Sequence, residues 1–314
     1  MLILRRSKNL LTVAFKHALA YWLGPTLCRL SWFRRNLPDG TLPTPERLRI
    51  FLEDLGGAFI KFGQMLALQP DVVPLEYCNA LFNLMDRISA FDYSLVERTF
   101  LEEFGRKPSE IFTYFDKHPL ATASIGQVHV AYLNGDKLAV KVQRPEVQKE
   151  FAGDIHLMKM AIRLITFLHL QKLYWMIEPM SEFIRWTQEE LDYRREARYM
   201  DRLHKNARDN ANERVPVVVW EYTTSRTLVA EFFEGTTVLN YLRAIDAGDR
   251  AVIQPLKERG FSADAVARRI IDNFLTDAFR HGMFHADLHP ANLMILPGNV
   301  VGYVDFGITG VLSH

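Results

Sequence analysis

The chain has 314 residues, a formal net charge of +1 and a hydrophobic fraction of 48%, so it can bury a sizeable core. The near-neutral charge gives no electrostatic basis for a nucleic-acid partner, and we expect none. The two cysteines, Cys28 and Cys78, lack metal-ligand spacing, which excludes a disulfide-rich secreted domain and indicates a reducing compartment.

The first 38 residues are basic and apolar and contain no acidic residue. Their cations are Arg5, Arg6, Lys8, Lys16, Arg29, Arg34 and Arg35. Such a segment favours the headgroup region of an anionic membrane, and its apolar runs are too short to span a bilayer. Two alternatives remain open: a mitochondrial transit peptide, and a helix that packs on the domain through its apolar face.

Residues 39–114 predict a helical extension. From Gly56 to Gln64 the pattern favours a helix in spite of three glycines, each of which costs about 1 kcal/mol relative to alanine in a helix. Glycines at such positions usually permit close packing of backbones. Lys61 and Gln64 are three residues apart and therefore share a face.

A pair of strands is predicted next. Asn134-Gly135 indicates a hairpin turn between Val128–Leu133 and Lys137–Val142, which places Lys141 in a small sheet. Just before the hairpin, the alanine-rich loop from Ala121 to His129 either presents backbone N–H groups to an anion or simply joins two strands.

The segment around Ile155 to Ile177 is strongly apolar, but it contains cations and histidines and predicts a partly buried helix, not a membrane span. These residues are His156, Lys159, Arg163, His169 and Lys172. Ser181 to Lys205 is rich in strong helix formers and has no Gly or Pro, so we predict one helix with Glu189, Asp192 and Glu196 on a common face. The nearby Arg194, Arg195 and Arg198 are candidate local partners.

Further along, Val215–Trp220 and Thr227–Phe233 predict strands, and Val238–Ala247 and Ala263–His281 predict helices. Gly282 follows the last helix in the position of a C-cap.

The most informative motifs lie near the C-terminus. Asp287 is followed five positions later by Asn292, and Asp305-Phe306-Gly307 follows a Val-rich stretch. This order and spacing are typical of the catalytic loop and the metal-binding loop of a phosphoryl-transfer site. Asp287 would orient or deprotonate the acceptor, while Asn292 and Asp305 would bind Mg²⁺ through oxygen.

Zinc is not expected among the neighbouring histidines. His281, His285 and His289 are four residues apart, but Gly282 and Pro290 interrupt any common helix face. We interpret His285 as structural.

A phosphoryl-transfer site of this kind requires a strand lysine and then a helical glutamate upstream. Lys141 and Glu196 meet this requirement; the alternatives are a solvent-facing edge-strand lysine and an ordinary charged helix. Glu231 and Phe233 lie where a kinase hinge would offer backbone groups to adenine. We therefore predict an N-lobe over residues 115–235 and a partial C-lobe over residues 236–314.

Four further signatures occur in order, and with the motifs above they resemble the UbiB/AarF atypical kinases, also called ADCK-type, which are associated with ubiquinone biosynthesis in bacteria and mitochondria. The signatures are Lys61-Phe62-Gly63-Gln64, the loop from Ala121 to His129, Glu190-Leu191-Asp192, and Glu196 within Arg-Glu-Ala. The catalytic loop departs from the family at Leu288 and Ala291, where Pro and Gly are common. The backbone at Ala291 must therefore have a negative φ or carry strain.

The resemblance implies an α+β, protein-kinase-like two-lobe fold with an N-terminal helical extension over the active site and an incomplete C-lobe. Lys61 and Gln64 would then point to the region where a protein kinase admits its peptide, and Glu190 or Asp192 would be the partner of Lys61; we predict regulatory roles for these four residues. ATP or ADP and Mg²⁺ are the implied cofactors, bound by Lys141 and the alanine-rich loop. The loop residues expected to contact nucleotide are Ala121, Ala123, Ser124, Ile125, Gly126 and Gln127. With Gly126 as its one glycine, this loop is stiffer than a three-glycine loop, so nucleotide preference is expected to differ.

The implied function is an atypical kinase or ATPase that supports the biosynthesis of ubiquinone or a related isoprenoid lipid at a membrane. Its expected partners are nucleotide, membrane lipids or isoprenoid-quinone intermediates, and lipid-biosynthesis enzymes. We expect a peripheral protein on the cytoplasmic face of a bacterial inner membrane, or a mitochondrial protein in a eukaryote. Since family members extend further than His314, we expect a truncated chain with weak activity and exposed apolar C-lobe surface. A non-catalytic nucleotide-binding scaffold and a small-molecule kinase are the alternatives.

Overall fold

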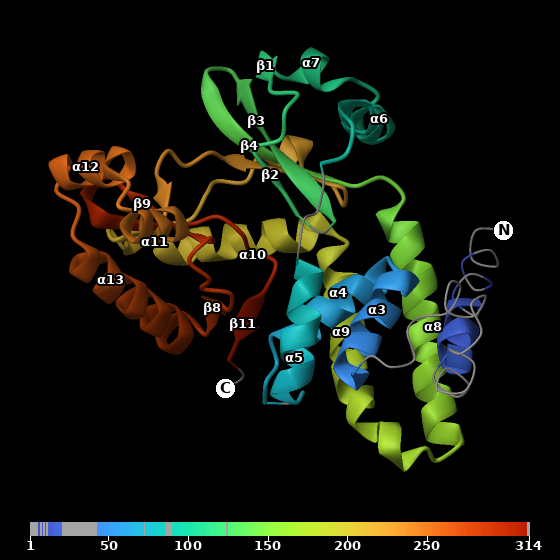
Figure 1. Cartoon of the computed structure of the whole chain (residues 1–314). Helices are drawn as coiled ribbons and strands as arrows, with labels where there is room; N and C mark the ends of the chain where they lie inside the picture. Colours follow the sequence, from blue (N-terminus) through green and yellow to red (C-terminus); the bar gives the residue numbers. More distant parts are fainter. Residues whose placement is uncertain are drawn as a thin grey trace. The chain divides into compact units, whose positions relative to one another are not determined.

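The computed structural model describes residues 6, 8, 10, 12–20, 43–71, 73–85, 90–123 and 125–312. They divide into two compact units, each assembled from separate stretches of the chain (Figure 1). Unit 1 comprises Met1–Ser89 and Pro145–Gln188, and unit 2 comprises Ala90–Arg144 and Glu189–His314. The combination of helices with mainly antiparallel sheets confirms the predicted α+β class.

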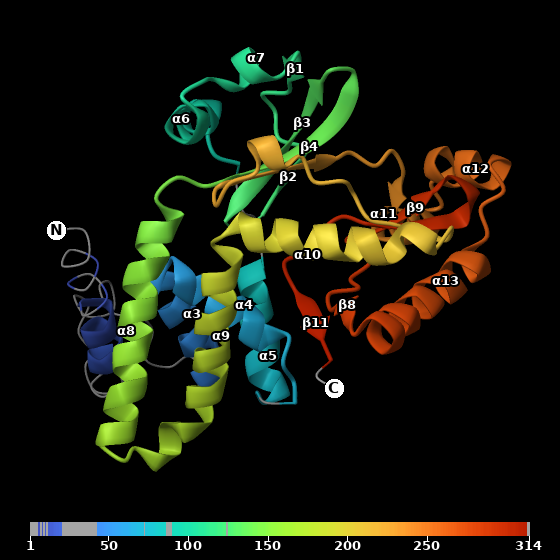
Figure 2. The same cartoon turned by 180° about the vertical axis from the view of Figure 1, so that it is seen from behind.

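Unit 1 is helical in its described part. Its elements from Thr44 onward are α3 (Thr44–Leu55), α4 (Ala58–Ala67), α5 (Leu75–Phe82), η1 (Asn83–Met85), α8 (Val147–Phe167), η2 (Gln171–Met176) and α9 (Ile177–Glu190), whose last residues enter unit 2. In Figures 1 and 2, α8 and α9 form a helical hairpin alongside α3 and α4. No helix among the described residues combines the length and the apolar composition needed to cross a bilayer.

The sequence predicts one helix through Gly56, Gly57 and Gly63, but in the structure only Gly63 lies within a helix. Gly56 and Gly57 have φ values of 65° and 57°, a left-handed conformation that ends α3 and precedes α4. Gly63 lies within α4, where an added Cβ would stand 2.5 Å from Leu84 Cδ1 and 2.9 Å from Leu52 Cδ1. The predicted close packing is therefore confirmed at Gly63, whereas the continuous helix was wrong.

Arg6, from the basic N-terminal segment, is bound into unit 1. Its Nε donates to Asp154 Oδ1 at 2.8 Å and its Nη2 donates to the Leu55 carbonyl at 2.9 Å. Asp154 is fully buried in α8 and also accepts from the Ala58 N–H at 3.0 Å. At Arg6 the segment thus packs on the domain and holds the α3–α4 junction to α8. Most of the remaining predicted membrane segment lies outside the described residues.

Unit 2 contains the sheets. Its elements are α6 (Tyr93–Phe104), α7 (Pro108–Ile111), β1 (Tyr114–Phe115), β2 (Ala121–Thr122), β3 (Gly126–Leu133), β4 (Asp136–Gln143), α10 (Tyr193–Asn206), η3 (Ala207–Asp209), β5 (Glu213–Arg214), η4 (Trp220–Tyr222), β6 (Thr227–Glu231), β7 (Thr236–Thr237), α11 (Val238–Ala247), α12 (Arg250–Glu258), α13 (Ala263–Thr276), the π-helical turn η5 (Asp277–His281), β8 (Met283–His285), β9 (Leu293–Leu296), η6 (Pro297–Asn299), β10 (Val300–Tyr303) and β11 (Thr309–Val311).

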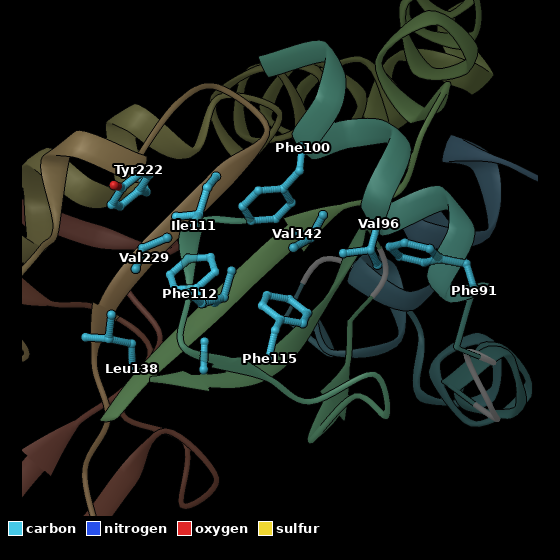
Figure 3. Close-up of a cluster of buried hydrophobic side chains, with 12 residues drawn as sticks. Phe91, Val96, Phe100, Ile111, Phe112, Phe115, Leu138, Val142, Tyr222 and Val229 are labelled. Atoms are coloured by element: carbon cyan, nitrogen blue, oxygen red, sulfur yellow. The ribbon is translucent and has the colours of Figure 1, made fainter. Parts of the chain in front are cut away.

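The larger sheet is antiparallel, with the order β1-β3-β4-β6 and β2 paired with β3. The predicted hairpin turn is confirmed, since Asn134 and Gly135 both have positive φ between β3 and β4. One face of this sheet packs against α6 and the segment after it. Figure 3 shows the resulting cluster, which includes Phe100, Phe112, Phe115, Leu138, Val140, Val142 and Val229.

The second sheet, β5-β10-β9-β7, and the small β8–β11 pair frame the C-terminal motifs. The predicted helix Val238–Ala247 is confirmed as α11. Gly282, with a φ of 68°, caps the later helical run that ends with η5. Three large apolar side chains in this region, Ile271, Leu275 and Phe279, are exposed.

Two further element predictions were wrong. The helix expected over Ser181–Lys205 is divided into α9 and α10, because Asp192 leaves the helix and caps α10 by accepting from the Arg194 N–H. Glu189, Asp192 and Glu196 therefore do not share a helix face. The strand expected over Val215–Trp220 is reduced to a single bridge between Val218 and Ala230.

Candidate active site

Strand β4 places Lys141 on the face of the sheet that is turned away from the aromatic cluster. Leu138, Val140 and Val142 belong to that cluster, and the side chains of a strand alternate between its faces. Lys141 therefore projects from the opposite face, where Val128 of β3 and Leu228 of β6 are its cross-strand neighbours.

Lys141 contacts two carboxylates that come from distant parts of the chain. Its Nζ lies 2.8 and 2.9 Å from the two carboxylate oxygens of Glu196 in α10, and 3.6 Å from Asp305 Oδ2. Glu196 is buried, with a side-chain exposure of 7%. The predicted Lys141–Glu196 pairing is present, and Asp305 adds a second negative charge beside the same ammonium.

The charges of this cluster stabilise one another. Burial by itself would lower the pKa of Lys141, but the carboxylates of Asp305 and Glu196 raise it well above its ordinary value. The Lys141 ammonium lowers the pKa of Asp305. Burial raises the pKa of Glu196, and Lys141 opposes this rise. The ammonium is therefore held in its charged form at neutral pH.

His285 fixes the backbone around the Asp-Phe-Gly motif. Its Nδ1 accepts a hydrogen bond from the Asp287 N–H at 3.2 Å, so its Nε2 carries the proton and donates to the Asp305 carbonyl. Burial lowers the pKa of His285, which keeps the ring neutral. Its ring also packs against Phe306, which is fully buried. His285 thus has the structural role that the sequence predicts.

The catalytic-loop residues Asp287 and Asn292 contact each other. Asn292 Nδ2 donates to Asp287 Oδ2 at 2.9 Å and to the Asp287 carbonyl at 3.2 Å. His289 holds the turn between them by accepting from the Asn292 N–H through its carbonyl. Ala291 is not among the described residues with positive φ, so replacing the usual glycine here introduces no backbone strain.

The alanine-rich loop forms a tight turn between β2 and β3. The Ala123 N–H donates to the Gly126 carbonyl at 2.8 Å. Ile125 is buried in this turn, whereas Ser124 lies outside the described residues. Gly126 is not among the described glycines that have a positive φ. A glycine is needed here for steric reasons, because an added Cβ would lie 2.4 Å from Tyr193 Oη.

Gln127 is fully buried on the other face of the sheet. It exchanges hydrogen bonds with the backbone of Phe91, accepting at 3.0 Å and donating at 3.3 Å, and it contacts His129 Nε2 at 2.9 Å. The structure therefore does not bring its side chain together with Lys141.

The predicted hinge follows β6. The Glu231 N–H donates to the Val217 carbonyl and the Phe232 N–H donates to the Lys137 carbonyl, so neither N–H is available to a ligand. The Glu231 side chain pairs with Arg214, and Phe233 is buried. Contacts of Glu231 and Phe233 with adenine stay a prediction.

The four predicted regulatory residues are divided between the units. Gln64 Nε2 donates to the Leu84 carbonyl at 2.7 Å within unit 1, and Asp192 is the α10 cap. Lys61 belongs to unit 1 and Glu190 to unit 2, and their predicted pairing stays a prediction.

Sequence reasoning missed two features of unit 2. Tyr193 follows the Asp192 cap directly; it is fully buried, its ring lies 5.2 Å from Lys141 Nζ, and its hydroxyl has no hydrogen-bond partner within the described part of the chain. The second feature is a buried carboxyl pair, Glu213 and Asp277, beside Asn210. Burial, with the Asp277 charge, raises the pKa of Glu213 to about 8, and burial raises the pKa of Asp277 to about 6.

Comparison with known proteins shows the family of the chain. The family model described as the ABC1 atypical kinase-like domain matches residues 83–314. The chain belongs to this ABC1 atypical kinase-like family. It is 32% identical over 288 residues to "Probable protein kinase UbiB" of Marinobacter nauticus, covering 88% of this chain and 49% of that protein.

A plant relative and a solved structure extend the comparison. The chain is 34% identical over 271 residues to "Protein ACTIVITY OF BC1 COMPLEX KINASE 7, chloroplastic" of Arabidopsis thaliana, covering 86% of this chain and 37% of that protein. A solved structure of Rv3197 from Mycobacterium tuberculosis, titled as its complex with erythromycin, superposes with a TM-score of 0.57 at 28% identity, covering 83% of this chain and 63% of that one. The chain thus spans about half the length of the curated UbiB relatives it matches. These matches confirm the predicted kinase-like fold.

The polar side chains of this ABC1-family site suit a nucleotide with Mg²⁺. No cluster of three or more His, Cys, Asp or Glu side chains suited to a metal occurs in the described ranges. Mg²⁺ differs from zinc in this respect, because it is usually held by one or two carboxylates together with substrate phosphates. Asp305 has a carboxylate that could bind Mg²⁺. Asn292 donates its NH₂ group to Asp287, which leaves its amide oxygen available as a ligand. The residues present therefore fit the predicted ligand.

Proposed function

We propose that this chain binds ATP or ADP with Mg²⁺ and catalyses phosphoryl transfer from ATP to water or to a small acceptor. The observation that carries the proposal is the convergence of Lys141, Glu196 and Asp305, which lie on three different elements. An ammonium held charged between two carboxylates is suited to bind phosphate oxygens.

Each polar residue of the site has a distinct proposed role. Lys141 binds nucleotide phosphates, and Glu196 positions it. Asp287 orients the acceptor and takes its proton, since its Oδ2 is fixed by Asn292 and its other oxygen is the base. Asn292 and Asp305 hold Mg²⁺, which when bound neutralises charge on the phosphates.

The relatives support a role in isoprenoid-lipid biosynthesis. Proteins named UbiB are about 32% identical to this chain, and we propose that it likewise supports the formation of ubiquinone or a related isoprenoid lipid at a membrane. Lipid-biosynthesis enzymes and quinone intermediates are the proposed partners.

The first experiment is a thermal shift of the 314-residue chain with ATP or ADP, with and without Mg²⁺. A ligand at one hundred times its Kd that binds only the folded state adds about 2.7 kcal/mol of stability. We expect a Mg²⁺-dependent rise in the melting temperature that is lost in Asp305→Asn. Asp264→Asn is the matched control, because Asp264 is 74% exposed on α13.

A turnover assay then separates catalysis from a scaffold role. Asp287→Asn should still bind nucleotide but lose hydrolysis, because the amide cannot take a proton. Equal and measurable turnover by the parent chain and Asp287→Asn would contradict the catalytic role of Asp287. Nucleotide binding with no turnover in the parent chain would favour the non-catalytic scaffold.

A further inference from the structure

The tip of the α8–α9 hairpin in unit 1 exposes an unusual amount of apolar surface. From Thr166 to Trp175 every residue whose exposure is described is solvent-exposed. Six of these residues are large and apolar, with exposures given in parentheses: Phe167 (79%), Leu168 (51%), Leu170 (40%), Leu173 (38%), Tyr174 (40%) and Trp175 (47%). Contiguous apolar surface of this kind marks an interaction site.

The patch continues along one side of α8. Met160 and Leu164 are exposed by 50% and 55%, and together with Phe167 they follow the spacing of one helix face. The core-facing residues of α8, such as Ile155 and Met158, lie on the opposite face. Helix α8 therefore has two apolar faces, and only one of them is buried in unit 1.

The charges within the tip segment itself have one sign, and the first acidic residue after it, Glu178, is exposed at the start of α9. No acidic residue occurs between Asp154 and Glu178. Lys159 and Arg163 are exposed on α8, at positions that border the apolar face of Met160 and Leu164. An apolar surface bordered by lysine and arginine is attracted to an anionic bilayer.

The shape and composition of the tip match a bilayer surface. Figures 1 and 2 show the turn between α8 and α9 extending beyond the ends of α3, α4 and α5, so its apolar side chains are presented at a projecting end. Tyr174 and Trp175 belong to the residue types that are enriched at membrane interfaces, where one part of the ring is in hydrocarbon and the other in water.

We propose that the α8–α9 tip docks on an anionic lipid bilayer, with Phe167, Leu168 and Trp175 in the headgroup and acyl boundary and Lys159 and Arg163 against lipid phosphates. This site differs from the basic N-terminal segment, and it does not depend on nucleotide binding. Docking of this type lies in the plane of the interface and does not cross the bilayer.

The test is flotation of the 314-residue chain with vesicles of phosphatidylglycerol and phosphatidylcholine, compared with vesicles of phosphatidylcholine alone. We expect at least tenfold stronger partitioning to the anionic vesicles, and at least a tenfold loss in the double variant Phe167→Ser, Trp175→Ser. Both side chains are exposed, so the variant should keep the parent's melting temperature. Phe279→Ser is the matched control, since Phe279 is 78% exposed in unit 2; it should bind vesicles like the parent.

Three outcomes would overturn the proposal. Unchanged vesicle binding by the double variant would assign lipid binding to another segment. Equal binding to the anionic and neutral vesicles would remove the role of Lys159 and Arg163. A parent chain that self-associates without lipid and becomes monomeric in the double variant, with no vesicle binding by either, would assign the tip to a protein partner.

Discussion

The Lys141 cluster makes a specific prediction about which of its members matters most for stability. Lys141→Met removes the cation from between Glu196 and Asp305 and leaves two carboxylates without it. Removing one partner from a buried ion pair costs about 3–5 kcal/mol. Since Glu196 is only 7% exposed and Lys141 Nζ contacts both of its oxygens, we expect Lys141→Met to cost about 3 kcal/mol.

Glu196→Gln should be much milder. The amide keeps an acceptor oxygen for Lys141 Nζ, and Asp305 Oδ2 remains at 3.6 Å as a second charge. The loss is then closer to that of a single hydrogen bond to a charged group, about 1.5 kcal/mol. The double variant should cost less than the sum of the two single variants, with a coupling of about 1–3 kcal/mol, because contacting residues are not additive.

The assay is native-state hydrogen exchange of peptides from β4 and α10, without nucleotide, since exchange reports the free energy of opening locally in a chain of two units. If Glu196→Gln destabilises β4 and α10 as much as Lys141→Met does, Asp305 contributes nothing to holding the ammonium, and the three-residue cluster described above is wrong.

Three more predictions concern other parts of the chain. Gly126→Ala forces a Cβ against Tyr193 Oη, so we expect a loss of about 1–3 kcal/mol in unit 2 and weaker nucleotide binding by thermal shift. Asp154→Ala leaves the Arg6 guanidinium without its buried carboxylate, and hydrogen exchange in α4 and α8 should show a loss of about 3 kcal/mol. The folded-state pKa values of about 8 for Glu213 and about 6 for Asp277 exceed the ordinary values of 4.5 and 3.8, so the folded state retains protons that the unfolded chain releases. The contribution of the two carboxyl groups to the free energy of unfolding is therefore complete below about pH 4 and is lost as the pH rises through 6 and 8. The loss is up to roughly 1.4 kcal/mol per pH unit for one proton. In urea unfolding, Asp277→Asn should make the free energy of unfolding less dependent on pH.

Each of these has a comparison that can refute it. Gly153→Ala adds a Cβ whose nearest neighbour is Arg6 Cγ at 4.0 Å, at a glycine that, like Gly126, has no positive φ; an equal loss there would refute the steric argument at Gly126. Asp54→Ala removes a partly exposed partner of Lys16 and should cost under about 1 kcal/mol, so a loss equal to that of Asp154→Ala would show that burial is not decisive. An Asp277→Asn variant with the parent's slope between pH 6 and 8 would show that the carboxyl pair does not titrate there.

The sequence predicts which residues of the site come together better than it predicts the ends of the helices. Asp287, Asn292 and Asp305 are close in the chain, so short loops are enough to bring them near one another, and their spacing is visible in the sequence. The pairing of Lys141 with Glu196 could be predicted from the sequence, because a strand lysine and a helical glutamate have few other arrangements in a kinase-like fold. The roles of these residues in catalysis stay predictions.

The break between α9 and α10 was not predictable from local propensity. The Leu191 carbonyl accepts from Gln143 Nε2 at 3.1 Å, and the Tyr193 N–H donates to the Ser225 carbonyl at 3.1 Å. These partners come from the folded sheet region and compete with the helix's own hydrogen bonds, so a run of strong helix formers gives no sign of them. The Glu213–Asp277 pair was equally hidden, since it forms only when β5 and η5 are brought together.

The sequence contained a sign that the strand predicted over Val215–Trp220 would not form. Pro216 has no N–H to donate to a ladder, and the structure keeps only the bridge at Val218.

The α8–α9 hairpin interrupts unit 2 between the strand that carries Lys141 and the helix that carries Glu196. The chain leaves unit 2 at Arg144 and returns at Glu189, and the hydrogen bond from Gln143 to Leu191 shows that the two junctions are adjacent. An insert whose ends meet can be lengthened, shortened or exchanged without moving its host. A change in the length of the hairpin at its exposed tip can thus leave the lysine and the glutamate on either side of it in their places.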